Sequence, residues 1–441
     1  MSQRRVVVTG YGMVTPLGGN ATETFDNACR GASGIRAITS FDTRGLPTNI
    51  GGEIDPAWIS AIKETLCEAN IRYDGRMEKF VTRSDTLILA ATLEAVGMAG
   101  LQLQQQTQRI GVSLGNHGQN PTVEDMMFLH RFCDGKGNWD VRALDKTGGY
   151  PIFNFFKRKP DVASALVAAA FRFSGPNLAV SSACAAGAQA IGEAFCMIRE
   201  GRAQVMIAGG AESCLDYTGF VGFVLIKALV QKYASPQRAS RPFDRRRNGF
   251  VMSEGAGALV LEDLEHAVDR NAPIYGELLG YGSSADAYRI TDTHPKGEGA
   301  ILAMRGALRD ANLLEPDSTQ PLPNAIDYIN AHGTSTIQND LTETLAIKQV
   351  FGPMAKDIPI SSNKSMLGHT IAAAGAIEAI LSIMGINHDT LLPTINYEHP
   401  DPKCDLDYVP NQARHKQHRR VLSNSFGFGG QNACLCIGKF E

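Results

Sequence analysis

The rest of the chain is organised around one stretch, Asn177-Leu-Ala-Val-Ser-Ser-Ala-Cys184-Ala-Ala-Gly-Ala-Gln-Ala-Ile191. Residues 177–182 predict a short buried strand, and the Ala-rich residues after them predict a helix. Unpaired backbone N–H groups and the helix dipole favour an anion at such a junction, so a cysteine there is expected to have a lowered thiol pKa. Cys184 is therefore a candidate nucleophile. The alternative, commoner for single cysteines, is a small buried apolar side chain.

Length and composition exclude several classes of protein. The 441 residues correspond to about three domains of ~150 residues, or to one large α/β unit. The longest apolar stretch, residues 162–171, falls short of the ~18 residues of a membrane span. The net charge of −3 argues against nucleic-acid binding. Residues 1–5 lead directly into a strand-like segment and leave no room for a secretory signal, and nine scattered cysteines without disulfide or metal spacing predict a reducing cytoplasm.

Strand-like and helix-like segments alternate along the chain, which predicts an α/β fold with a mostly parallel sheet. The same order of elements recurs after about residue 265, so we expect a duplicated architecture with halves at 1–265 and 266–441. Helices are predicted at residues 78–99, 300–311 and 372–386. Residues 116–165 are irregular, and we expect them to cap one face of the first half.

A second group of polar residues follows the strand predicted at 325–331. It contains His332, Gly333, Thr334 and Thr336. Open α/β sheets bind ligands at the carboxyl ends of their strands, so His332 is a candidate catalytic imidazole and the threonines could line a substrate path. The alternatives are a loop histidine bonded to backbone, and threonines that only cap the next helix.

A third group, between Ser361 and Glu378, again joins a strand to an Ala-rich helix. Lys364 and His369 flank its short loop. A buried lysine needs a carboxylate partner, which Asp340 or Glu343 could supply. The alternative for Lys364 is a surface cation.

The fourth group is Gly427-Phe428-Gly429-Gly430, between the last two predicted strands. Glycines let the backbone approach a ligand closely, and their N–H groups are suitable oxyanion donors. We expect the segment to be a tight hairpin as well. One cysteine and two histidines at strand ends fit covalent acyl transfer through a thioester, with N–H donors for a developing enolate oxygen.

Taken together, these motifs resemble the β-ketoacyl-acyl-carrier-protein synthases, elongating condensing enzymes of type II fatty acid synthesis in the thiolase superfamily. Each motif alone is weak, but the combined spacing is specific. The resemblance covers nearly the whole chain, including residues 5–18, 181–187, 241–244, 249–251 and 254–257. It implies a thiolase fold with duplicated α/β halves in five layers, α-β-α-β-α, and a homodimer.

The resemblance also implies a role for each site residue. Cys184 would carry the acyl group, and His332 and His369 would bind the malonyl thioester and promote decarboxylation. The N–H groups of Cys184 and Phe428 would form the oxyanion hole, with Phe428 also gating the acyl pocket. Lys364 would pair with Glu343 and order the histidine loop.

Partners and ligands follow from the same resemblance. Thr334 and Thr336 would bind the phosphopantetheine arm of an acyl carrier protein, and no cofactor would be required. A basic rim for this acidic partner is assigned to Arg76 and Lys232. A structural Na⁺ or K⁺ would be held by four residues: Asn330, Glu378, Ser423 and Asn424.

Several positions depart from the family pattern. Asn248, Ser253 and Gln431 stand where Asp, Gly and Thr are expected, Gly115-Asn-His117 replaces a more Gly-rich run, and residues 135–165 are longer and rewritten. The catalytic positions are intact, so these departures bear on the acyl substrate. They raise the alternative of a specialised polyketide or polyene pathway.

Two other functions were considered, and one sequence feature argues against each. The Lys364 and His369 pair argues against a thiolase or CoA-using enzyme, which carries Cys-His-Cys or Cys-His-Asn. A non-catalytic chain-length partner subunit would lack the nucleophile, and Cys184 is present.

Overall fold

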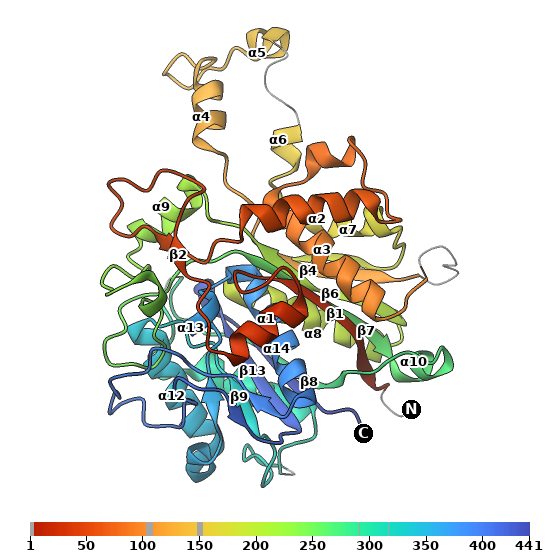
Figure 1. The fold of residues 1–441 in the computed structure, drawn as a ribbon, viewed down its shortest axis with the longest axis vertical. Helices are drawn as coiled ribbons and strands as arrows, with labels where there is room; N and C mark the ends of the chain where they lie inside the picture. Colours follow the sequence, from red (N-terminus) through yellow and green to blue (C-terminus); the bar gives the residue numbers. More distant parts are fainter. Residues whose placement is uncertain (1–3, 103–108, 148–152, 291, 316) are drawn as a thin grey trace.

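The computed structural model describes residues 4–102, 109–147, 153–290, 292–315 and 317–441. Its main sheet has the strand order β10-β9-β13-β14-β8-β1-β7-β6-β4-β5 (Figure 1). These strands are β1 (Val6–Val14), β4 (Gly111–Asn116), β5 (Asn177–Val180), β6 (Val205–Glu212), β7 (Gly255–Asp263), β8 (Gly276–Ala285), β9 (Tyr328–Asn330), β10 (Ile360–Ser361), β13 (Arg420–Phe426) and β14 (Gln431–Gly438). Two small sheets pair β2 (Arg36–Ala37) with β3 (Ile50–Gly51), and β11 (Thr390–Leu391) with β12 (Arg414–His415).

The two halves of the main sheet have the same topology. From the centre outwards the first half runs β1-β7-β6-β4-β5 and the second runs β8-β14-β13-β9-β10. In each half the first two pairings are antiparallel and the last two are parallel. Within the main sheet, the described strands of the two halves join where residues 6–8 of β1 pair with β8. The structure therefore has the duplicated α/β architecture expected from the sequence, and the limits 1–265 and 266–441 stay a prediction. The prediction of a mostly parallel sheet was wrong, because five of the nine pairings in the main sheet are antiparallel.

Helices form three layers around these strands. The middle layer is α8 (Ala186–Arg199) and α14 (Ala374–Asn387), which share one apolar core with strands of both halves. On the outer faces, α3 (Arg83–Met98) and α7 (Val162–Phe171) cover the first half, and α11 (Glu298–Asp310) and α12 (Ile337–Phe351) cover the second. The three predicted helices correspond to α3, α11 and α14. Thr82 and Asp85 form a capping box at the start of α3, which places its first turn later than predicted.

The middle helices approach one another through glycines. A Cβ on Gly187 of α8 would lie 2.7 Å from the Ala372 carbonyl, and one on Gly375 of α14 would lie 2.7 Å from the Ala188 nitrogen. Neither distance leaves room for a side chain. This contact fixes the loops that precede α8 and α14, which carry Cys184 and His369.

The remaining helices are short or peripheral. They are α1 (Ala21–Cys29), α2 (Pro56–Glu68), α4 (Val123–His130), α5 (Val141–Thr147), α6 (Phe153–Phe156), α9 (Tyr217–Leu225), α10 (Leu264–Asp269) and α13 (Lys364–Leu367). Among the described residues, no helix combines the length and the apolar character that a membrane crossing needs.

Two expectations about local structure were wrong. The strand before Cys184 is not buried: β5 is the edge strand, and Asn177 and Ala179 are exposed because only β4 lies beside it. The excursion over 116–165 does not cap a face, since α4 and α5 project away from the body (Figure 1). Apolar residues in this arm, including Met127 and Val141, are exposed. Residues 148–152 of the excursion lie outside the described residues.

Candidate active site

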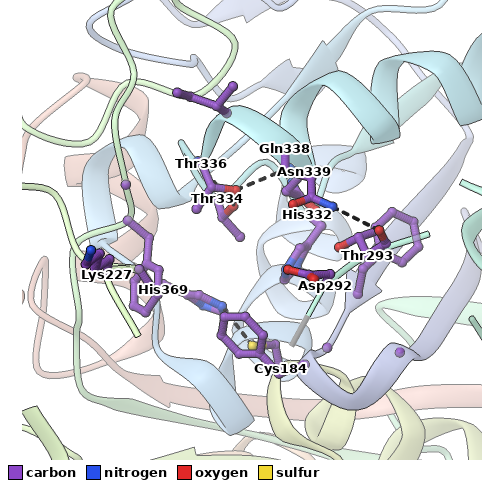
Figure 2. A pocket seen from close by; sticks show the side chains of 18 of the residues that line it. Cys184, Lys227, Asp292, Thr293, His332, Thr334, Thr336, Gln338, Asn339 and His369 are labelled. Carbon is purple, nitrogen blue, oxygen red and sulfur yellow. Dashed lines mark hydrogen bonds between the residues drawn. The ribbon is translucent and has the colours of Figure 1, made fainter. Parts of the chain in front are cut away.

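The four sequence groups meet in one pocket of about 300 Å³ (Figure 2). Cys184, His332, His369 and Phe428 lie within its lining, together with both threonines of the second group. Sequence reasoning assigned no site role to the other lining residues, which come from four segments: Lys227, Ala228, Asn248, Gly249, Phe250, Asp292, Thr293, Ile337, Gln338 and Asn339. They carry no local motif, so only the fold brings them to the pocket.

Cys184 lies in a 3-10 turn, Ala183–Ala185, that leads into α8. Ala183 adopts a left-handed φ of 48°, which is strained for a non-glycine residue and bends the chain sharply between β5 and α8. The fourth group approaches this turn closely: a Cβ on Gly427 would lie 2.9 Å from the Ser182 carbonyl. The hairpin predicted for this group is confirmed, because β13 and β14 pair directly on either side of it.

The Cys184 thiol is protonated in the resting site. The side chain is buried, and burial raises its pKa to about 12, while the Lys364 charge and the backbone N–H groups of Phe428 and Cys184 act in the opposite direction. The lowered pKa expected at a helix N-terminus was wrong, because desolvation outweighs the N–H groups. Those two N–H groups nonetheless lie at the sulfur, where an oxyanion would form.

Two buried imidazoles lie beside the thiol. His369 Nε2 is 3.1 Å from Cys184 Sγ, and the rings of His369 and His332 are 5.3 Å apart, nearly perpendicular. One ligand atom from each of the three residues lies within 4.8 Å of the others. Burial and then the Lys364 charge hold the pKa of both histidines well below the usual range. Both rings are therefore neutral at pH 7.

Hydrogen bonds fix the tautomer of His369. The backbone N–H of Ile371 donates to His369 Nδ1 at 3.3 Å, so the ring proton of the neutral imidazole lies on Nε2, which faces the sulfur. His369 is thus poised to donate a hydrogen bond into the pocket. His332 Nδ1 is buried without a hydrogen-bond partner among the described residues.

The buried Lys364 ammonium pairs with Glu378 of α14, so the predicted pairing with Glu343 was wrong. Asp340, the other carboxylate considered, lies 3.6 Å from Arg247. Glu378 is an acidic residue in an otherwise apolar helix, and that isolation is the signal that could have identified it as the partner. Burial raises the pKa of Glu378 to about 7, with Lys364 opposing the rise.

Glu343 has a different task. It accepts hydrogen bonds from the backbone N–H groups of His332 and Gly333, at 2.9 and 2.8 Å, and from the Asn424 amide at 3.1 Å. It therefore holds the loop that carries His332. Lys364 and Glu343 both order the histidines, but through separate contacts.

The four residues assigned to a monovalent cation lie near this ion pair. The Oδ1 of Asn330 and the Oε2 of Glu378 are buried without hydrogen-bond partners among the described residues. Asn330 and Ser423 face each other on β9 and β13. The Oδ1 of Asn424 already accepts from the Cys434 thiol at 3.0 Å. Two unpaired oxygens fit a cation site, and Asn424 would join it only through another atom.

Both threonines line the pocket, and Thr336 also caps the next helix. Thr336 is the N-cap of α12 and accepts from the Asn339 N–H at 3.3 Å, and it also lines the pocket. The Thr334 hydroxyl is 3.0 Å from that of Thr336. Of the two rim residues, Lys232 is bonded through its backbone to Asn248 of the pocket wall, whereas Arg76 lies at a separate 3-10 turn and is not among the lining residues.

The raised thiol pKa predicts how alkylation of Cys184 depends on pH. Because the thiolate is the nucleophile, its labelling by iodoacetamide should rise about tenfold per pH unit from pH 7 to 10. Free cysteine, with a pKa of about 8.5, should level off within that range. Mass spectrometry of the labelled peptide measures the rate. A plateau below pH 8 would contradict the buried, protonated thiol.

The ion pair predicts the outcome of a double-variant comparison. Lys364→Met should lower the free energy of unfolding by about 3–5 kcal/mol, because it leaves Glu378 buried without its partner. Adding Glu378→Gln should restore part of this loss. Adding Glu343→Gln should not, since Glu343 bonds the His332 loop instead. Chemical denaturation measures all three, and equal recovery by both second substitutions would refute the pairing.

Comparison with known proteins agrees with this geometry. Residues 3–267 match the model of the β-ketoacyl synthase N-terminal domain, and residues 275–398 match that of its C-terminal domain. A 3-oxoacyl-[acyl-carrier-protein] synthase 2 from Coxiella burnetii is 40% identical over 100% of this chain and 99% of its own. One from Staphylococcus aureus is 41% identical over 100% of both.

Solved structures give the same result. A β-ketoacyl synthase from Burkholderia phymatum has a TM-score of 0.85 at 31% identity, covering 99% of this chain and 100% of its own. The ishigamide ketosynthase/chain length factor has a TM-score of 0.83, and a type II polyketide acyl-carrier protein in complex with its ketosynthase one of 0.82. Both are 33% identical and cover 100% of both chains. The chain therefore belongs to the β-ketoacyl synthase family of condensing acyltransferases.

Proposed function

We propose that this enzyme is a 3-oxoacyl-[acyl-carrier-protein] synthase, which extends an acyl chain on Cys184 by two carbons taken from malonyl-carrier protein. The observation that carries the proposal is the meeting of one buried thiol, two neutral imidazoles and two backbone N–H groups in a single pocket. Full-length similarity to synthases of that name supports it.

The first step transfers the acyl group. The Cys184 sulfur attacks the carbonyl carbon of the acyl thioester, the bond to the carrier sulfur breaks, and the thiol proton leaves with the departing carrier thiol. The N–H groups of Cys184 and Phe428, which already lie at the sulfur, hold the tetrahedral oxyanion. The product is a neutral thioester, so the buried site holds no unpaired charge between the two steps.

The second step forms the new carbon–carbon bond. The malonyl carbonyl oxygen accepts hydrogen bonds from His332 and His369, carbon dioxide leaves, and the resulting carbanion attacks the acyl-Cys184 carbonyl. The Cys184 thiolate is released and takes up a proton. Neutral imidazoles suffice because decarboxylation drives the step, and losing one such donor typically costs about 3 kcal/mol in the barrier.

The carrier protein docks at the pocket mouth. Exposed cations lie on two adjoining segments there: Lys227, Lys232, Arg245 and Arg246. Asn248 joins the segments, accepting from the backbone N–H of Lys232 and donating to its carbonyl. Charge reversal at Lys227 and Lys232 should slow association with an acidic carrier, more so at low salt. An unchanged rate in both salts would remove these lysines from the rim.

A homodimer is the proposed assembly. The outer edge of β5 is unpaired in the described chain, and the α4–α5 arm exposes apolar side chains. Sedimentation of the purified protein tests this, and a monomer mass at micromolar concentration would contradict it. A cytoplasmic location also remains a proposal.

A bound Na⁺ or K⁺ would satisfy the unpaired oxygens of Asn330 and Glu378. It would act on structure, by fixing the ends of β9 and α14, and on no step of the reaction. Replacing K⁺ by a bulky organic cation should lower the melting temperature. An identical melting temperature in both salts would argue against the site.

A specialised polyketide or polyene pathway is the second candidate, favoured by similarity to the ishigamide ketosynthase/chain length factor. The curated synthases are more similar, at 40–41% identity against 33%, so elongation of fatty acyl chains is preferred. The acyl group found on Cys184 after incubation with mixed acyl-carrier thioesters would decide between them.

Two variants separate the two chemical steps. Cys184→Ala should lose acylation and condensation but keep malonyl decarboxylation, since the imidazoles remain. His369→Ala should keep acyl transfer and lose decarboxylation, by a factor of about 100 or more. Release of labelled carbon dioxide and the mass of the acyl-enzyme are the readouts. Condensation by Cys184→Ala, or unchanged decarboxylation by His369→Ala, would refute the proposed roles.

A further inference from the structure

Two adjoining segments form walls of the pocket that holds Cys184. One wall is the run Asn248, Gly249 and Phe250, and the other is the loop and first turn of α12 from Thr334 to Asn339. Under the proposed function a thioester arm passes along both of them. The spacing of these walls therefore decides whether the arm fits.

The second wall does not hold its shape by itself. Gly333 and Ser335 both adopt left-handed backbone, with φ of 39° and 72°. For Ser335 this conformation is strained, and such strain persists only where surrounding contacts impose it. One contact comes from the first wall, where the Gly249 N–H donates to the Ser335 carbonyl at 3.1 Å, and one comes from the chain before it, where the Arg241 N–H donates to the Ser335 hydroxyl at 3.0 Å.

Arg247 is the residue that joins the two walls. It directly precedes Asn248 in the first wall, and its side chain is buried. Its guanidinium donates to the carbonyls of Thr336 at 3.2 Å and Ile337 at 3.4 Å in the second wall. Because these carbonyls begin α12, the bonds set where Thr334 and Thr336 lie.

Three further contacts hold the guanidinium itself in place. It donates to Asp401 at 2.8 Å and to the Asp244 carbonyl at 2.9 Å, and it lies 3.6 Å from the Asp340 carboxylate. Asp340 in turn accepts from the Phe243 N–H at 2.8 Å. A lysine could not reproduce this set, since one ammonium lacks the planar arrangement of five donors.

We propose that Arg247 is a positioning residue, which fixes the spacing between the two channel walls and so adapts the channel to the pantetheine part of the thioester. It does not line the pocket and touches no reacting atom. The inference rests on the proposed function, since it assumes that a pantetheine thioester reaches Cys184. Substitution of Arg247 should therefore slow acylation of Cys184 by a donor that carries the long pantetheine group more than acylation by a short donor.

The test compares acylation of Cys184 by two donors with the same acyl group. One is the acyl-pantetheine thioester, and the other is the acyl ethyl thioester, which is too short to contact Thr334 and Thr336. In Arg247→Lys the second-order rate with pantetheine should fall between about tenfold and 100-fold, and that with the ethyl thioester should change little. Intact-protein mass spectrometry follows the acyl-enzyme. Arg202→Lys, at an exposed surface pair with Glu200, is the matched control and should leave both rates unchanged.

An equal loss with both donors would show a general structural defect and overturn the inference, as would unchanged rates in Arg247→Lys. If that variant does not fold, Asp401→Asn takes its place and should show a smaller loss confined to pantetheine; equal changes with both donors would overturn the inference. Failure of the wild-type enzyme to be acylated at Cys184 by either donor would instead refute the proposed function itself.

Discussion

Burial and, after it, one enclosed cation set the pKa values of the site. The Lys364 ammonium is fully enclosed and paired with Glu378, and its charge acts on the thiol of Cys184 and on both imidazoles. It favours the thiolate over the thiol and the neutral imidazole over the imidazolium. A surface lysine would be screened by water, whereas this one acts across a dry interior. Glu378 on α14 pairs with this ammonium and so offsets the free-energy cost of burying its charge.

The packing of α8 against α14 gives this charge its position. Cys184 lies just before α8, and His369, Lys364 and Glu378 lie before or on α14, so two distant parts of the chain meet only because the helices touch. Gly187 and Gly375 allow the contact. The duplicated topology thus has a direct chemical result: each half contributes the loop before its middle helix, and one loop carries the nucleophile while the other carries an imidazole.

Local sequence was enough to predict that Cys184, His332 and His369 share one pocket, because each motif follows a strand and strand ends collect at one edge of a sheet. It was not enough to predict lining residues such as Lys227 and Asp292, which belong to no motif. Nor was it enough to predict pairing between motifs. The residues left Asp340 and Glu343 open as partners of Lys364, and the resemblance implied Glu343, whereas the partner in the structure is Glu378 on α14. The predicted lowering of the Cys184 thiol pKa was also wrong, because the sequence indicates that a helix begins there but does not indicate how deeply the thiol is buried. The prediction that residues 116–165 cap one face was wrong for α4 and α5, because their apolar residues look the same in the sequence whether they are covered or exposed.

The raised pKa of Cys184 and its role as nucleophile are compatible once the whole cycle is considered. The resting thiol, the acyl thioester and both imidazoles are neutral, so these groups add no charge to the buried ion pair of Lys364 and Glu378 in the stable states of the cycle. Negative charge develops only transiently, on the sulfur, the oxyanion and the enolate. The fixed N–H groups and the Lys364 charge are already oriented towards it, so little reorganisation accompanies the charge. A permanently ionised thiolate would draw on the same donors in the ground state and leave less stabilisation for the transition state.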